Sequence, residues 1–142
     1  MTAKQYLNQI RGYDYSIERC QKEIERLESD LIQISGIDYS KPQVDSSPSP
    51  DAVSASALDE IRRLQDKYRQ LLVERSKARD KITGQILAMD HELFRAILSE
   101  RYIDMMQLAE IAERHHYSLD YITHAHGWAL QEFERLYKDD MF

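Results

Sequence analysis

Apolar side chains recur at alternating intervals of four and three residues through the first part of the chain. The series consists of Tyr6, Ile10, Tyr13, Ile17, Cys20, Ile24, Leu27, Leu31 and Ile34. Charged residues between Glu18 and Glu28 fill most of the intervening positions. This spacing places the apolar side chains on one helix face, in the heptad pattern of a coiled coil. We therefore expect a long helix that needs a partner to cover its apolar stripe.

The pattern stops across residues 36–56 and then resumes. Pro42, Pro48 and Pro50 each remove an amide donor and disfavour helix at the preceding residue, so we predict a proline- and serine-rich linker over 36–56. The apolar spacing returns at Ala57, Ile61, Leu64, Tyr68, Leu71, Ala78 and Ile82. This second series predicts another long helix.

The linker is long enough for the second helix to fold back antiparallel on the first, or to pair with a second copy of the chain. The sequence is compatible with both arrangements. Because coiled-coil seams often recruit a second chain, we expect a homodimer. The predicted interface, within one hairpin or between chains, comprises Tyr6, Ile10, Tyr13, Ile17, Ile24, Leu27, Leu31, Ile61, Leu64, Tyr68 and Leu71.

Shorter helical patterns follow residue 89. We expect Asp90 to cap a helix that continues to Tyr102, and a short helix to run through Leu108, Ile111 and Ala112. After a turn at residues 115–117, Ser118 is the expected N-cap of a final helix. The apolar stripe of that helix is Ile122, Ala125, His126, Ala129, Leu130, Phe133 and Leu136. Two helices joined by a tight turn predict a helix-turn-helix.

These elements together predict an all-α protein in two parts. Residues 1–89 form an antiparallel helical hairpin, or coiled-coil arm, and residues 90–142 form a helix-turn-helix head. The composition agrees, because the 142 residues include four glycines and three prolines and are otherwise rich in helix formers. Charged residues interrupt every apolar stretch and no leader pattern opens the chain, so we expect no membrane association and a cytoplasmic location.

Charge is distributed unevenly along the chain. Residues 1–89 carry 14 acidic and 14 basic side chains, whereas residues 90–142 carry 11 acidic and 5 basic ones. The head therefore holds the whole formal net charge of −6. A nucleic-acid-binding face usually has the opposite sign of charge.

Several segments of the head resemble the DNA-binding fourth region of bacterial sigma factors. The resemblance rests on residues 101–103 (RYI), 108–112 (LAEIA), 117–118 (YS), 126–127 (HG) and 129–130 (AL), in that order and spacing. Over the whole chain, residues 3–10 (AKQYLNQI), 38–41 (DYSK), Val44 and residues 47–48 (SP) resemble a family of small phage and prophage proteins of Gram-positive bacteria. That family is related to the ArpU and RinA late-gene regulators.

This resemblance implies that the last helix enters the major groove of double-stranded DNA or docks on RNA polymerase. The residues it places toward the groove are Ser118, Asp120, Tyr121, Thr123, His124 and Gly127. The sequence departs from the expected chemistry, because residues 118–134 contain no lysine or arginine. Phosphate neutralisation supplies most non-specific affinity for DNA, so this helix alone should bind weakly. His116 stands where the family commonly has glycine, and histidine tolerates the left-handed conformation such a turn requires.

Other groups of side chains are better explained without a dedicated site. The basic residues between Arg62 and Lys81 fit the solvated flank of a coiled coil paired with acids. His115, His116, His124 and His126 lack the spacing of metal ligands, so we expect no metal and no cofactor. No nucleophile motif or phosphate-binding loop is present, which indicates that the protein is not an enzyme.

The aromatic side chains of the head leave two alternatives. We expect Tyr117, Tyr121 and Trp128 to lie in the core or at its rim, whereas exposure of all three would indicate an interface.

Two functions follow. The first is a phage-encoded transcriptional regulator that binds promoter DNA, RNA polymerase or both through residues 90–142. The second is an inhibitor or adaptor of a host protein that retains the fold but has lost DNA binding, which the acidic head favours. A purely structural coiled-coil protein is a third, weaker alternative.

Overall fold

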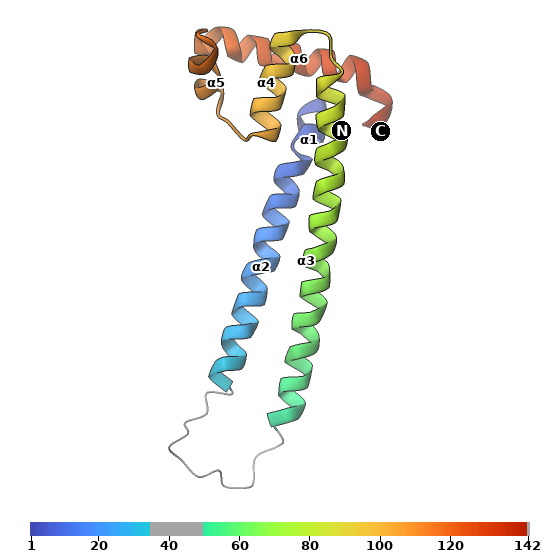
Figure 1. The fold of residues 1–142 in the computed structure, drawn as a ribbon, viewed down its shortest axis with the longest axis vertical. Helices are drawn as coiled ribbons and strands as arrows, with labels where there is room; N and C mark the ends of the chain where they lie inside the picture. Colours follow the sequence, from blue (N-terminus) through green and yellow to red (C-terminus); the bar gives the residue numbers. More distant parts are fainter. Residues whose placement is uncertain (35–49, 142) are drawn as a thin grey trace. The chain divides into compact units, whose positions relative to one another are not determined.

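The computed structural model describes residues 1–34 and 50–141, and the side chains of 1–33 and 55–141. Every regular element within these ranges is helical, which confirms the all-α prediction (Figure 1). The elements are α1 (Ala3–Leu7), α2 (Gln9–Ile34), α3 (Pro50–Leu87), α4 (Glu92–Leu98), the π-helical η1 (Ser99–Ile103), α5 (Leu108–His115), α6 (Leu119–Tyr137) and the 3₁₀-helical η2 (Lys138–Asp140). None of the described helices is both long and apolar enough to cross a membrane.

The chain divides into two compact units. The hairpin unit is Tyr15–Val73, and the head unit combines Met1–Asp14 with Glu74–Phe142. The sequence predicted a division after residue 89. In the structure, the start of the chain and the end of α3 instead belong to the head unit. Their apolar side chains explain this difference, because they help to form the head core described below.

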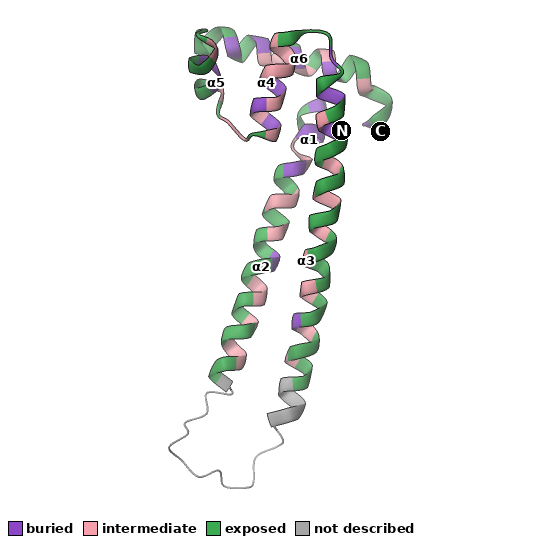
Figure 2. Cartoon of the chain, in the orientation of Figure 1, coloured by how far each residue is buried: buried purple, intermediate pink, exposed green. Residues whose placement is uncertain are grey.

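In the hairpin unit, α2 and α3 run antiparallel and bury the predicted seam (Figure 1). Cys20 and Ile61 are buried, and the thiol of Cys20 donates a hydrogen bond to the carbonyl oxygen of Leu64 at 3.2 Å. The facing sides of the two helices carry the buried and intermediate positions in Figure 2. The half-buried seam residues of this unit are Ile17, Ile24, Leu27, Leu31, Leu64, Tyr68 and Leu71. The two helices therefore pair within one chain, one of the two arrangements that the sequence left open.

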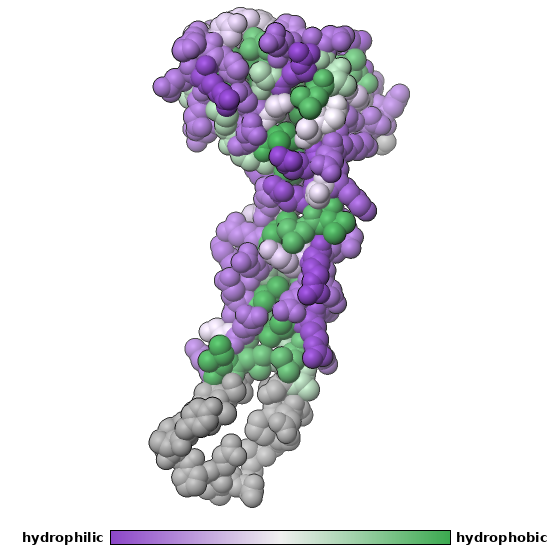
Figure 3. All heavy atoms as spheres, viewed as in Figure 1, coloured by the Kyte–Doolittle hydropathy of each residue, from purple (hydrophilic) through white to green (hydrophobic). Residues whose placement is uncertain are grey.

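The outer faces of the hairpin unit are charged. Figure 3 shows hydrophobic side chains between the two helices and hydrophilic ones on their outer sides. Arg62, Arg63 and Arg69 pair with Asp59, Glu60 and Asp66, each three residues earlier. For these three arginines, the prediction of a solvated flank paired with acids is confirmed.

α3 begins earlier than predicted. The expected linker ended at Ser56, but the helix starts at Pro50, so residues 50–56 are helical. Proline is well tolerated at the first position of a helix, because the amide it lacks would have no helical partner there. Residues 36–49 of the predicted linker lie outside the described residues.

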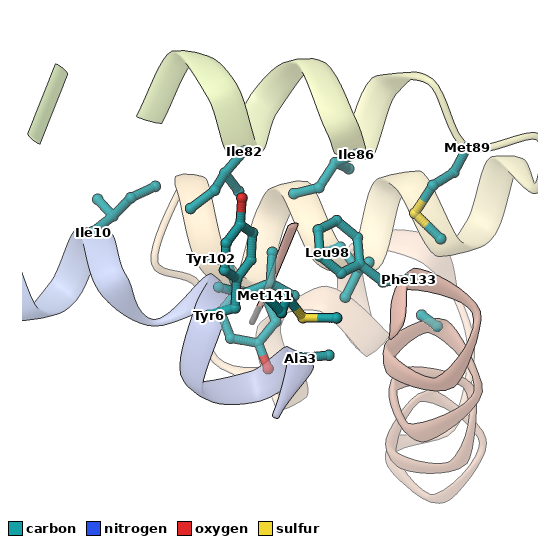
Figure 4. Packing of buried hydrophobic residues seen from close by; sticks show 12 residues of the cluster. Ala3, Tyr6, Ile10, Ile82, Ile86, Met89, Leu98, Tyr102, Phe133 and Met141 are labelled. Carbon is teal, nitrogen blue, oxygen red and sulfur yellow. The ribbon is translucent and has the colours of Figure 1, made fainter. Parts of the chain in front are cut away.

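The head unit is built around a core that joins both ends of the chain (Figure 4). Leu7 and Ile10 contribute from the start of the chain, Ile82 and Ile86 from the end of α3, and Phe133 from α6. Each of these side chains is fully buried, and burial of one such group stabilises a fold by about 1.5–3 kcal/mol. Tyr6 and Ile10, predicted as interface residues of the arm, are therefore part of the head core.

Gln85 is a buried polar residue in this core. Its side-chain oxygen accepts a hydrogen bond from Tyr6 Oη at 2.9 Å, and its amide donates to Asp140 Oδ2 at 3.1 Å. Tyr137 Oη donates to the Gln85 backbone carbonyl at 2.7 Å. Because a buried polar group is costly only when it lacks partners, these bonds allow glutamine to occupy a core position and connect α1, α3 and the end of the chain.

The start of α4 also differs from its predicted form. His91, rather than Asp90, is the N-cap, and its Nδ1 accepts a hydrogen bond from the Phe94 amide at 3.4 Å. Both Asp90 and His91 can accept such a bond, so the position at which the chain leaves α3 determines which of them caps α4. The predicted continuation to Tyr102 is present, but it passes through the π-helical turn Ser99–Ile103.

Candidate functional site

The candidate site is the helix-turn-helix formed by α5 and α6. The turn between them has His116 in the left-handed conformation, with φ of 60°. The Tyr117 amide donates to the Ala112 carbonyl at 3.0 Å, which satisfies a carbonyl at the end of α5. Ser118 then caps α6, as predicted, by accepting a hydrogen bond from the Tyr121 amide at 3.1 Å. Histidine thus occupies a turn position that usually favours glycine.

A small apolar core holds the two helices together. Ile111 and Ala112 of α5 pack with Ile122 and Ala125 of α6 and with Ile97 of α4. All five side chains are buried. The core therefore fixes which face of α6 points outward.

The residues predicted to contact DNA lie on the outer side of α6. Ser118, Asp120, Tyr121, Thr123 and His124 are exposed, whereas Gly127 is half-buried. The Thr123 hydroxyl donates to the Leu119 carbonyl at 2.8 Å, and His124 Nδ1 lies 2.7 Å from the Asp120 carbonyl. A neutral His124 that donates from Nδ1 has Nε2 as an acceptor. The first half of α6 therefore presents an exposed polar surface without lysine or arginine.

Positive charge lies beside α6 rather than on it. Arg11 and Arg101 line a cavity of about 500 Å³ together with Met105, Gln107, Leu108, Ala109 and Leu119, which we call the arginine-lined cavity. Gln107 is the N-cap residue of α5, so the amide end of that helix adjoins the two guanidinium groups. Two guanidinium groups beside the N-terminal end of a helix are groups that bind anions.

Arg101 is held in place by the loop that follows η1. Its guanidinium donates to the Met106 carbonyl at 2.9 Å, next to Met105, whose φ of 58° lies in the left-handed region. In the sequence, Arg101 stands out only as part of the sigma-like motif, and no pattern marks Arg11 as a site residue. These two residues are 90 positions apart, and only the folding of the chain start into the head unit brings them together.

An exposed row of aromatic side chains begins at the turn and continues along α6, where it shares Tyr121 with the residues predicted to contact DNA. Tyr117, Tyr121 and Trp128 are 46%, 40% and 47% exposed, so of the predicted positions, core or rim, the core is excluded. The ring centroids of Tyr117 and Tyr121 are 5.0 Å apart, and those of Tyr121 and Trp128 are 6.1 Å apart in an edge-to-face arrangement. We call these three residues the aromatic row. They are exposed because the buried stripe of α6 uses Ile122, Ala125, Ala129 and Phe133 instead.

A second cavity adjoins this row. Its volume is about 640 Å³, and its lining includes Asp90, Glu92, Leu93, His115 and Tyr117. His91 and Ala96 complete the lining, which contains no lysine or arginine. We call it the acid-lined cavity. Tyr117 belongs both to this cavity and to the aromatic row, so the two features are continuous.

A buried carboxylate connects η1 to the end of α5. Glu100 of η1 is only 7% exposed, and its two oxygens lie 2.6 Å from His115 Nε2 and 3.2 Å from Arg114 Nε. Both partners are at the end of α5. Removing one member of such a group leaves an uncompensated buried charge, so this contact fixes α5 against η1.

Each of the clustered histidines has its own local role. His116 forms the turn, His115 contacts Glu100, and His126 Nε2 lies 2.8 Å from Tyr102 Oη. Burial, reinforced by nearby Arg101, lowers the pKa of His126, and burial raises the pKa of Tyr102. Among the described residues, no three His, Cys, Asp or Glu side chains are grouped closely enough to hold a metal ion.

Comparisons of the chain with known protein families, curated proteins and solved structures find no match.

Proposed function

We propose that the protein is a phage-encoded transcriptional regulator that binds double-stranded DNA through its helix-turn-helix. The observation that carries this proposal is the outward-facing first half of α6, where Ser118, Asp120, Tyr121, Thr123 and His124 are exposed. A helix presented in this way has the geometry that allows side chains to reach base edges in the major groove. Thr123 and His124 are the residues best suited to such contacts.

The arginine-lined cavity supplies the phosphate contacts that α6 lacks. Leu119, in the first turn of α6, and Gln107, at the start of α5, both line this cavity with Arg11 and Arg101. A phosphate near these groups would meet two guanidinium groups and the amide end of α5. The cationic component of DNA binding therefore comes from residues outside the recognition helix.

A second function, docking on RNA polymerase or on another host protein, is favoured by a different observation. α6 carries no lysine or arginine before Arg135, and Arg135 pairs with Glu132 at 2.6 Å. The exposed aromatic row is typical of a protein interface.

The test is a fluorescence-anisotropy titration of the full chain against labelled duplexes of random sequence and duplexes carrying late promoters, at low and physiological salt. We expect salt-dependent binding in the micromolar range or tighter. Arg11→Ala should weaken binding to all duplexes and reduce the salt slope by about one, because it removes one phosphate contact.

Arg62→Ala is the matched control, since Arg62 is an exposed arginine in the hairpin unit. It should leave DNA affinity unchanged. Absence of binding at low salt would contradict DNA recognition and favour the protein-docking function.

A further inference from the structure

We propose that the aromatic row and the acid-lined cavity together bind an arginine-presenting segment of a protein partner. The inference does not depend on DNA binding. It rests on three features of the head unit. The rings of the aromatic row are exposed, the acid-lined cavity is continuous with them, and the lining of that cavity contains carboxylates but no lysine or arginine.

The rings form a continuous surface along one side of α6. Tyr121 and Trp128 are seven residues apart, which is close to two helical turns, so they lie on the same face. Tyr117 extends the row across the turn and into the acid-lined cavity. A bound segment can therefore contact the row and the cavity at once.

The charge around this surface selects a cation. Asp90 and Glu92, both exposed, line the cavity, and the Asp120 side chain is 90% exposed at the start of α6. The two histidines of the lining have protein partners, because His91 caps α4 and His115 contacts Glu100. Carboxylates at this density attract arginine or lysine and repel phosphate.

Aromatic faces beside carboxylates favour arginine over lysine. A guanidinium group stacks on tyrosine or tryptophan while its N–H groups donate to a carboxylate in a bidentate manner. An ammonium group makes the charge contact but does not stack in this way. The partner segment should therefore present arginine.

This surface shares Asp120 and Tyr121 with the outward-facing residues proposed to contact DNA, but it lies away from the arginine-lined cavity. Leu119 lines the arginine-lined cavity, whereas Tyr121 belongs to the aromatic row. Residues two apart on a helix are separated by about 200°, so these side chains lie on nearly opposite sides of α6. The head unit thus has a cationic side for an anion and an acidic, aromatic side for a cation.

The experiment uses the full chain and a fluorophore-labelled peptide of alternating arginine and glycine, compared with a matched lysine-glycine peptide. Trp128 is the only tryptophan, so its intrinsic fluorescence reports binding at the row directly. We expect a saturable change in Trp128 fluorescence, and at least about threefold tighter binding of the arginine peptide. Tyr121→Ala should weaken that binding by about threefold to tenfold.

The charge is tested separately with the double variant Asp90→Asn/Glu92→Gln. It should weaken arginine-peptide binding at least about threefold and leave affinity for duplex DNA undiminished. The matched controls are Tyr15→Ala, an exposed tyrosine of the hairpin unit, and Glu134→Gln, an exposed carboxylate elsewhere on α6. Both controls should bind the peptide within about twofold of the parent chain.

Three results would overturn the inference. The first is equal weakening by Glu134→Gln and by the double variant, which would show attraction to overall charge alone. The second is the absence of a saturable Trp128 response at low salt, whether or not the peptide binds. The third is a labelled single-stranded oligonucleotide that perturbs Trp128 more strongly than the peptide, which would assign the row to nucleic acid.

Discussion

His126 and Tyr102 form a hydrogen-bonded pair where α6 meets η1. Their side-chain atoms are 2.8 Å apart, and their rings are stacked with centroids 5.7 Å apart. Since burial lowers the pKa of His126, the folded protein favours the neutral imidazole. The stability contributed by this residue therefore depends on pH.

We expect the free energy of unfolding to fall as the pH is lowered below about 6.5, the ordinary histidine value. Above this value His126 is neutral in both states, and its contribution is fully present. Below it the unfolded chain binds a proton that the folded chain does not, until the pH reaches the lowered pKa. Urea unfolding at pH 7.5, 6.5 and 5.5 measures this loss.

His126→Gln removes the titration and retains a hydrogen-bonding group for Tyr102. The stability advantage of the parent chain over this variant should be larger at pH 7.5 than at pH 5.5. His124→Gln, at an exposed position of α6, is the matched control for the loss of a histidine side chain. Parallel profiles for the parent chain and His126→Gln would show that His126 titrates equally in both states.

At the level of the elements, the connection between α5 and α6 determines which side of α6 is presented. The turn needs a left-handed residue, which His116 supplies with φ of 60°. A side chain in this conformation carries strain that glycine avoids. The helix-turn-helix therefore keeps its geometry at a small cost in stability.

His116→Gly should raise the free energy of unfolding by about 0.5–1 kcal/mol, because it relieves this strain. The matched variant is His124→Gly, in the interior of α6, which should lower it by about 0.5 kcal/mol because glycine disfavours helix. Thermal unfolding of the two variants measures whether each substitution raises or lowers the free energy of unfolding. A decrease for His116→Gly would mean that the histidine side chain stabilises the turn in some other way.

At the scale of the whole molecule, we predict that two copies of the chain associate through exposed apolar residues of α3. The seam of the hairpin unit is covered within one chain, so a dimer needs a different face. Leu58, Leu72 and Val73 of α3 are large apolar residues that remain exposed. Leu58 and Leu72 are fourteen residues apart, about four helical turns, and so lie on the same side of the helix. These exposed apolar residues, of which Leu58 and Leu72 flank the seam, are the candidate dimer interface.

We expect light scattering at micromolar concentrations to give twice the 16.8 kDa mass of one chain. Leu58→Glu/Leu72→Glu should raise the dissociation constant of the dimer at least about tenfold, because it places charges in an apolar contact. Gln33→Glu, at an exposed position of α2, adds charge without removing an apolar group and should leave the mass unchanged. A single-chain mass at every concentration would contradict the dimer.

The helices could be predicted from local patterns because each pattern depends on residues close in sequence. The four-three spacing predicted α2 and α3, and Ser118 and His116 predicted the cap and the turn of the helix-turn-helix. Two helix boundaries differ from the prediction. Pro50 begins a helix instead of lying within the linker, and His91 caps α4 instead of Asp90, because both residue types are compatible with either role.

The surfaces around α6 depend on contacts between distant residues. Periodicity shows that Tyr121 and Trp128 share a face but not whether another element covers them, and the structure leaves both exposed. Arg11 joins Arg101, and Asp90 joins Tyr117, only through packing of the head core. Helix type and amphipathic faces thus follow from local spacing, whereas exposure and the grouping of charges follow from long-range burial of apolar side chains.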